Sequence, residues 1–235
     1  MSNPFFKFKQ FTVFHDKCAM KVGTDGVLLG AWAPVGNVKR ALDVGTGTGL
    51  IALLLAQRNL QARITAVEID AAAAEQAQEN VLHSPWADRI EVICHDFRSY
   101  RTEDKFDLIV SNPPYFVDAL KCPDEQRCTA RHTSSLNYDL LFRRSASLLW
   151  EQGVVSIIIP AEAEKAVIDT AWNHKLFPAH RLQVFTKPGK PCRRILLTLG
   201  FQEKQCMEES LCIEAEQHGY SAEYIALTKD FYLKL

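Results

Sequence analysis

The stretch from residue 41 to residue 57 narrows the possible folds more than any other part of the chain. It joins a strand pattern at 41–44 (ALDV), a glycine-rich turn at 45–49 (GTGTG) and an apolar helix pattern at 50–57 (LIALLLAQ). A strand, a glycine turn and a helix in this order form the first unit of a doubly wound α/β sheet. Glycine lets the backbone approach a ligand closely, so we expect ligand contact at Gly45, Gly47 and Gly49.

The glycine spacing and the preceding acid indicate the kind of ligand. A dinucleotide-binding turn has the pattern Gly-x-Gly-x-x-Gly and places a pyrophosphate at the helix N-terminus. This chain has Gly-x-Gly-x-Gly, and Asp43 precedes the turn. A carboxylate there would repel a pyrophosphate but would attract the ammonium group of an amino acid. The pattern therefore favours S-adenosylmethionine over NAD, with Asp43 facing the methionine end.

A second strand pattern, 64–67 (ITAV), leads directly to Glu68. An acid about 20 residues after the glycine turn commonly accepts hydrogen bonds from the ribose hydroxyls of a bound nucleoside. Glu68 is the candidate for this role, while Asp70 is placed to cap the helix expected at 71–82. The alternative is that both acids only cap that helix.

A third strand pattern, 90–93 (IEVI), is followed by Asp96 and Phe97. Asp96 could accept from the exocyclic amine of an adenine, and Phe97 could pack on its ring. Ligands of such sheets bind beyond the carboxyl ends of the strands. We therefore expect one ligand-binding edge that carries all three strand-end acids, Asp43, Glu68 and Asp96.

A fourth strand pattern, 106–110 (FDLIV), ends in Ser-Asn-Pro-Pro-Tyr. Pro113 and Pro114 lack an N–H group, so they end the sheet ladder and fix the backbone at the strand's end. A planar amine or amide nitrogen could be bound by the Asn112 amide and a fixed carbonyl, with the aromatic face of Tyr115 stacked on its plane. These four residues are the catalytic candidates; the alternative is a proline-rich turn that only closes the strand.

The N-terminal segment 1–35 is expected to cover the cofactor or substrate, and 36–235 to form the cofactor-binding part of one compact domain. A helix is expected from Val27 to Ala33 with Thr24 as its N-cap. Asp25, beside a glycine in the loop before this helix, could cover the charged end of a cofactor.

The C-terminal half continues the sheet. Apolar runs at 154–159, 181–186 and 195–199 predict three more strands, the last two an antiparallel pair. With the four strands above, they predict a Rossmann-like, doubly wound, seven-stranded α/β sheet. We expect it to be mostly parallel, with a C-terminal antiparallel strand and helices on both faces.

Two segments concentrate positive charge near the expected ligand-binding edge. The long stretch 116–136 has no clear periodicity and is interpreted as a substrate lid, with a solvated loop as the alternative. The connector 187–194 (KPGKPCRR) carries four positive charges and suits phosphate binding, although a solvated hairpin is the alternative. The RNA-binding candidates in these segments are Arg127, Arg131, Lys187, Lys190, Arg193 and Arg194.

Composition limits the remaining classes of function. The formal net charge of −1 argues against tight nucleic-acid binding through bulk charge, but not against a local basic patch. There is no apolar run long enough to span a bilayer and no signal-peptide pattern. The seven cysteines include no Cys-x-x-Cys pair, which predicts free thiols, no metal site and a cytoplasmic location.

The motifs together resemble the class I S-adenosylmethionine-dependent methyltransferases. Asn112-Pro113-Pro114-Tyr115 matches the signature of those that methylate amino groups. Four further segments are similar to the bacterial tRNA1(Val) (adenine(37)-N6)-methyltransferase family: residues 15–25, 130–132, 187–197 and 223–232. The resemblance covers nearly the whole chain.

This resemblance implies methyl transfer from S-adenosyl-L-methionine to N6 of an adenine in tRNA, at adenine 37 in the anticodon loop. It also implies a flipped target base, stacked on Tyr115 and held by Asn112 and the Pro113 carbonyl. Neither a metal nor a membrane is implied, and a monomer is expected.

Other functions remain open at this point. The four-residue signature also fits methylation of guanine N2 in rRNA, adenine N6 in DNA or glutamine N5 in a protein. A chaperone that binds RNA and the cofactor without catalysis is an alternative from another class. An NAD-dependent dehydrogenase is disfavoured by the glycine spacing, and binding of S-adenosylhomocysteine rather than NAD would exclude it.

Overall fold

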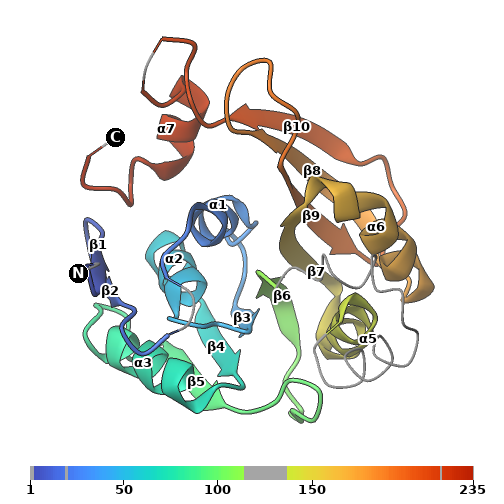
Figure 1. Ribbon diagram of the computed structural model, residues 1–235. Coiled ribbons are helices and arrows are strands. Elements are labelled where there is room, and N and C mark those ends of the chain that lie inside the picture. The colour runs from blue at the N-terminus through green and yellow to red at the C-terminus, as the bar shows by residue number, and fades with distance from the viewer. Residues whose placement is uncertain (1–2, 19–20, 114–136, 218, 235) are drawn as a thin grey trace, which may run out of the picture.

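An eight-stranded sheet forms the centre of the computed structural model, which describes residues 3–18, 21–113, 137–217 and 219–234 (Figure 1). The strand order is β10-β8-β9-β7-β6-β3-β4-β5. The strands are β3 (Arg40–Val44), β4 (Arg63–Glu68), β5 (Ile90–Cys94), β6 (Phe106–Ser111), β7 (Leu149–Pro160), β8 (Phe177–Phe185), β9 (Arg194–Gly200) and β10 (Met207–Cys212).

The strand directions confirm the expected doubly wound sheet. The strands β5, β4, β3, β6 and β7 run parallel to one another, and β9 runs antiparallel to both β7 and β8. One strand more than expected is present, because β10 pairs in parallel with β8. Its sequence (MEESLC) is polar and mostly exposed, so backbone pairing at the sheet edge, and not an apolar pattern, makes it a strand.

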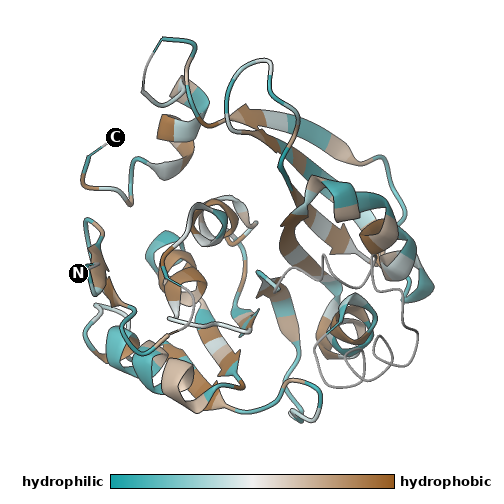
Figure 2. Cartoon of the chain, viewed as in Figure 1, coloured by the Kyte–Doolittle hydropathy of each residue, from teal (hydrophilic) through white to brown (hydrophobic). Residues whose placement is uncertain are grey.

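Helices cover both faces, as expected. One core lies under α1 (Thr24–Trp32), α2 (Leu50–Arg58), α3 (Ala71–Leu82) and α7 (Ala222–Thr228). The other lies under α5 (Tyr138–Leu148) and α6 (Glu164–Asn173), which follows the short helix η1 (Ala161–Ala163). Successive residues of a strand point to opposite faces, so Ala41 joins the first core and Leu42 the second. Figure 2 shows hydrophobic central strands and hydrophilic positions on the outer helices.

The helix α1 begins earlier than expected. Its N-cap is Gly23, which has no side chain to cap with, and Thr24 is already the first helical residue. The expectation that Thr24 caps a helix starting at Val27 was therefore wrong. The helix ends at Trp32, and its C-cap Ala33 is followed by Pro34.

The connection from β5 to β6 contains no helix. Phe97 and Tyr100 are instead buried in the second core, where they pack with Leu42, Val44 and Val67 of the neighbouring strands. Phe97, which was expected at the ligand-binding edge, is therefore buried in the core.

A hairpin of β1 (Phe5–Lys7) and β2 (Thr12–Phe14) docks the N-terminal segment on the first core. Phe11 packs edge-on against Trp86, with ring centroids 5.5 Å apart. Beyond this hairpin, Lys17 pairs with Glu75 and Glu79 of α3. The segment thus shares the main core, and a boundary at residue 35 stays a prediction.

One buried amide ties this segment to the glycine turn. Asn80 of α3 is fully buried; its Oδ1 accepts from the Phe14 N–H at 2.9 Å. Its Nδ2 donates to the carbonyls of Phe14 and Thr48, both at 2.9 Å. Asn80 therefore sets the position of the N-terminal segment relative to the turn.

Replacement of this amide should destabilise the fold. We expect Asn80→Leu to lower the free energy of unfolding by about 2–4 kcal/mol, because buried backbone groups lose their partners. Urea denaturation measures this. The matched control is Gln78→Leu on the same helix, whose side chain forms no hydrogen bond with a described residue and should change stability by less than about 0.5 kcal/mol. Equal effects of the two substitutions would contradict the role of Asn80.

Candidate functional site

The carboxyl ends of four parallel strands bring the candidate residues to one edge of the sheet. Val44 at the end of β3 lies opposite Val67 of β4 and Ser111 of β6, and Glu68 lies opposite Cys94 of β5. The segments that carry Asp43, Glu68, Asp96 and Asn112 therefore converge at this edge, called the rim below.

The glycine turn has a left-handed backbone and an open side. Gly45, Gly47 and Gly49 have φ of 71°, 57° and 80°, a region that favours glycine. A Cβ added at Gly45 or Gly47 would meet no atom within 4 Å. At Gly49 it would contact Ala77 of α3 at 3.5 Å. The turn thus packs on α3 at its end and leaves open space beside its first two glycines.

Glu68 holds this turn in place. Its Oε2 accepts from the Gly47 N–H at 2.8 Å, and its Oε1 accepts from the N–H groups of Ile69 at 2.9 Å and Asp70 at 3.0 Å. Asp70 is the N-cap of α3, as expected, and accepts from the Ala73 N–H. Glu68 therefore joins the glycine turn to the end of β4, in addition to accepting from the N–H groups just before α3.

Asp43 is fully buried beneath the turn. Its Oδ2 accepts from the Thr46 hydroxyl at 2.6 Å and from the Ala52 N–H at 3.2 Å. Its Oδ1 is buried and has no hydrogen-bond partner among the described residues. Burial raises the pKa of Asp43 to about 7, the Glu68 charge adds to this, and the bonds from Thr46 and Ala52 oppose it. A positively charged ligand group near Oδ1 would favour the charged form.

Asp96 and Phe97 lie at the carboxyl end of β5, and both are engaged by arginines. Asp96 accepts from the Arg98 backbone N–H at 2.8 Å and from its Nε at 2.7 Å. Phe97 is 4% exposed, and the guanidinium of Arg144 lies 5.8 Å from its ring centroid. Phe97 therefore presents little surface to a ligand. Sequence reasoning missed Arg144, because it approaches from α5, far along the chain.

Asn112 follows β6 and is half-buried, next to the buried Pro113. The Ser111 hydroxyl donates to the Val44 carbonyl at 2.8 Å, which ties the ends of β6 and β3 together. No hydrogen bond from the described part of the chain engages the Asn112 amide. Among the other candidates, Pro114, Tyr115, Arg127 and Arg131 lie outside the described residues, as does the proposed lid.

Two residues for which different roles were predicted contact each other: Asp25, a cofactor-binding candidate, and Arg194, an RNA-binding candidate. Asp25, in the first turn of α1, accepts from the Nε of Arg194 at 2.9 Å. This ion pair joins the start of α1 to the start of β9. Asp25 thus balances the charge of Arg194. The two residues are 169 positions apart, so no local sequence pattern indicates this contact.

The connector between β8 and β9 lies on the rim, because β8 runs in the same direction as β7. Lys187 pairs with Glu214 at 3.0 Å. Lys190 and Arg193 are exposed and form no ion pair with a described residue. Of the four cations in the connector, Lys190 and Arg193 are therefore available to an anionic ligand without exchange of a described ion-pair partner.

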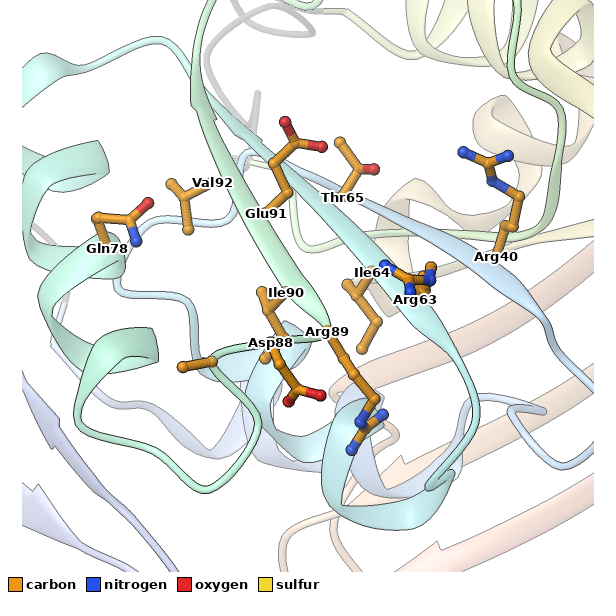
Figure 3. Close-up of a pocket in the computed structure, with 11 residues that line it drawn as sticks. Arg40, Arg63, Ile64, Thr65, Gln78, Asp88, Arg89, Ile90, Glu91 and Val92 are labelled. Carbon is orange, nitrogen blue, oxygen red and sulfur yellow. The ribbon is translucent and has the colours of Figure 1, made fainter.

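A hollow of about 450 Å³ lies elsewhere, at the amino-terminal half of the outer strands (Figure 3). Arg40, Arg63 and Arg89, which precede or begin β3, β4 and β5, line it together with Glu91. It is separate from the rim. Arg89 donates to the carbonyls of Ala56, Asn59 and Ala62, so it supports the fold there.

Comparisons with known proteins agree with the geometry of the rim. The model of the methyltransferase small domain family matches residues 19–165. A protein of Bacteroides fragilis named tRNA1(Val) (adenine(37)-N6)-methyltransferase is 55% identical over 238 residues, covering 100% of both chains. This chain belongs to the tRNA1(Val) (adenine(37)-N6)-methyltransferase family.

Solved structures of methyltransferases share the fold. A protein described as a predicted O-methyltransferase from Agrobacterium tumefaciens is 19% identical, with a TM-score of 0.70 over 88% of this chain and 96% of its own. An O-methyltransferase of Brevibacillus brevis, solved with S-adenosyl-L-homocysteine, is 18% identical, with a TM-score of 0.50 over 67% of this chain and 52% of its own.

S-adenosyl-L-methionine is the cofactor of this methyltransferase. The rim fits it in two respects: the buried Oδ1 of Asp43 lacks a partner in the described part of the chain, and the turn is open at Gly45 and Gly47. Across the described ranges, no His, Cys, Asp and Glu cluster could hold a metal ion, and no helix is long and apolar enough to cross a membrane.

Asp43 should make the stability of the cofactor-free enzyme depend on pH. Its pKa in the folded chain, about 7, lies above the usual 3.8, so the folded state holds an extra proton between these values. The stability that this proton contributes is present below the lower value and is lost as the pH rises through the upper one. We expect the free energy of unfolding to fall more steeply between about pH 4 and about pH 7 in the wild type than in Asp43→Asn. Parallel urea-denaturation profiles would contradict the raised pKa.

Proposed function

We propose that this chain transfers the methyl group of S-adenosyl-L-methionine to N6 of an adenine in tRNA, at adenine 37 in the anticodon loop of tRNA1(Val). The observation that carries the proposal is the full-length identity of 55% to a relative named for this activity. The Asn112 amide at the rim, which has no hydrogen-bond partner among the described residues, supports it, because an amide oxygen can accept from an adenine amine. We further propose that the enzyme acts as a monomer in the cytoplasm, where its tRNA substrate would be found.

The cofactor would lie along the rim. Asp43 would face its ammonium group, Glu68 its ribose hydroxyls, and Asp96 with the edge of Phe97 its adenine. The turn at Gly45, Gly47 and Gly49 would let the backbone approach it. Asp25 would contribute to cofactor binding together with Arg194, because the two residues form an ion pair at the start of α1. The bound cofactor supplies an electrophilic methyl group attached to sulfur.

The target adenine would leave the base stack, because its amine cannot be reached within a stacked loop. The Asn112 side chain and the Pro113 carbonyl would accept from N6, while Pro114 fixes the backbone and Tyr115 stacks on the base. These bonds direct the N6 lone pair towards the methyl carbon. The cofactor would supply the methyl group and leave as S-adenosylhomocysteine, and the N6 proton would pass to water. Positioning and hydrogen-bond orientation would provide the rate enhancement.

The connector would contact the tRNA backbone through Lys190 and Arg193. Arg127 and Arg131 remain candidates from the lid. Lys187 and Arg194 are paired with carboxylates, so their contribution would require exchange of partners.

Loss of the Asn112 amide should remove catalysis and spare cofactor binding. We expect Asn112→Ala to lower the rate of methylation about 10²–10³-fold, since a preorganised acceptor is lost. The assay uses labelled cofactor with tRNA from a strain lacking the enzyme and identifies N6-methyladenosine in tRNA1(Val). Affinity for S-adenosylhomocysteine should stay within about twofold.

The matched control is Asn37→Ala, an exposed asparagine before β3, which should leave the rate unchanged. An unchanged rate in Asn112→Ala would remove the assigned role. Label in guanine, DNA or glutamine, and none in tRNA, would retain the fold and cofactor but overturn the target.

Neutralising the connector should weaken tRNA binding in a salt-dependent manner. We expect Lys190→Gln combined with Arg193→Gln to lower the slope of log K against log salt by about 1.4–1.8, because two phosphate contacts are lost. Lys165→Gln on α6, whose partner is Asp169, is the control and should leave the slope as in the wild type. If the double variant also retains the wild-type slope, the connector is a solvated hairpin.

A further inference from the structure

Two arginines from separate elements converge on one carbonyl oxygen beside the rim. Arg101, in the connection from β5 to β6, donates its Nη1 to the Tyr100 carbonyl at 3.1 Å. Arg144 of α5 donates its Nη2 to the same oxygen. Two positive charges thus share a single neutral acceptor.

These charges are not balanced by carboxylates in the described part of the chain. No ion pair there involves Arg101, Arg143 or Arg144, whereas Arg40 pairs with Asp104 and Arg181 with Glu164. The Nε of Arg144 is buried and lacks an acceptor among the described residues. Burial lowers the pKa of Arg144, and the charges of Arg101 and Arg143 lower it further. Arg143 directly precedes Arg144 on α5.

The position of the group links it to the rim. Arg144 lies over Phe97, which directly follows Asp96 at the carboxyl end of β5. The arginines come from two segments, α5 and the connection from β5 to β6, and Arg101 and Arg144 meet at the Tyr100 carbonyl. Phe97 and Tyr100 hold Arg144 in place, while Arg101 and Arg143 are exposed.

A convergent set of guanidinium groups without carboxylate partners is suited to a phosphate, which accepts paired N–H donors from planar forks. S-adenosylmethionine contains no phosphate, so a phosphate here would belong to the nucleic-acid substrate. We propose that Arg101, Arg143 and Arg144 form a binding site for a backbone phosphate of the tRNA, beside the adenine end of the cofactor site. This inference rests on the proposed function and adds a contact surface formed by segments other than the 187–194 connector.

The test uses the full-length enzyme and its tRNA. We expect Arg101→Gln combined with Arg143→Gln to lower the salt slope of tRNA binding by about 1.4–1.8. Affinity for S-adenosylhomocysteine and the thermal midpoint should stay at wild-type values, because both side chains are exposed. The double lysine variant, Arg101→Lys with Arg143→Lys, keeps the charge and should retain the slope. Arg63→Gln, at the exposed amino end of β4, is the matched control and should also retain it.

The outcomes separate this inference from the proposed function. If the wild type methylates tRNA and the glutamine variant keeps its salt slope, the phosphate site is overturned and the proposed function stands. If the slope falls equally in the lysine variant, charge is not the cause and the site is likewise overturned. If the wild type neither binds nor methylates tRNA, both fail. A lowered slope in the glutamine variant alone supports the site.

Discussion

The hydrogen bond from the Gly47 N–H to Glu68 is the contact on which the site depends. A turn with three left-handed glycines cannot be held by a regular ladder, so its shape must be fixed from outside. Glu68 does this from the end of β4, and the Val67 carbonyl accepts from the N–H groups of Gly45 and Thr46. With the turn fixed, α2 starts at Leu50 and the open side of the turn faces the rim.

Burial of Asp43 beneath this turn links cofactor binding to electrostatics. One oxygen of this buried carboxylate has no partner among the residues that the structure describes, so its charged form is costly, and a cationic ligand group would offset that cost. The same carboxylate organises Thr46 and the first turn of α2. The residue that would recognise the ligand thus also shapes the turn that would receive it.

The distribution of paired and unpaired arginines suggests how a nearly neutral chain can bind an anionic substrate. The formal net charge is −1, and many surface cations are paired with acids. Among the described residues, exposed cations without such partners occur in two places: Lys190 and Arg193 in the connector between β8 and β9, and Arg101 and Arg143 in the connection from β5 to β6 and on α5. In the proposed function, the tRNA backbone would contact both groups.

The sequence by itself determined the parallel sheet, the glycine turn, the helix at 71–82 with its Asp70 cap, and the common edge for the strand-end acids. These follow from local apolar patterns and from the rule that parallel strands end together. Only the tertiary structure decided that β10 joins the sheet, that α1 starts at Thr24, that Asp25 pairs with Arg194 and that Arg144 covers Phe97. Apart from the start of α1, these features arise from contacts between segments that are far apart in the chain, where neither periodicity nor residue spacing carries a signal.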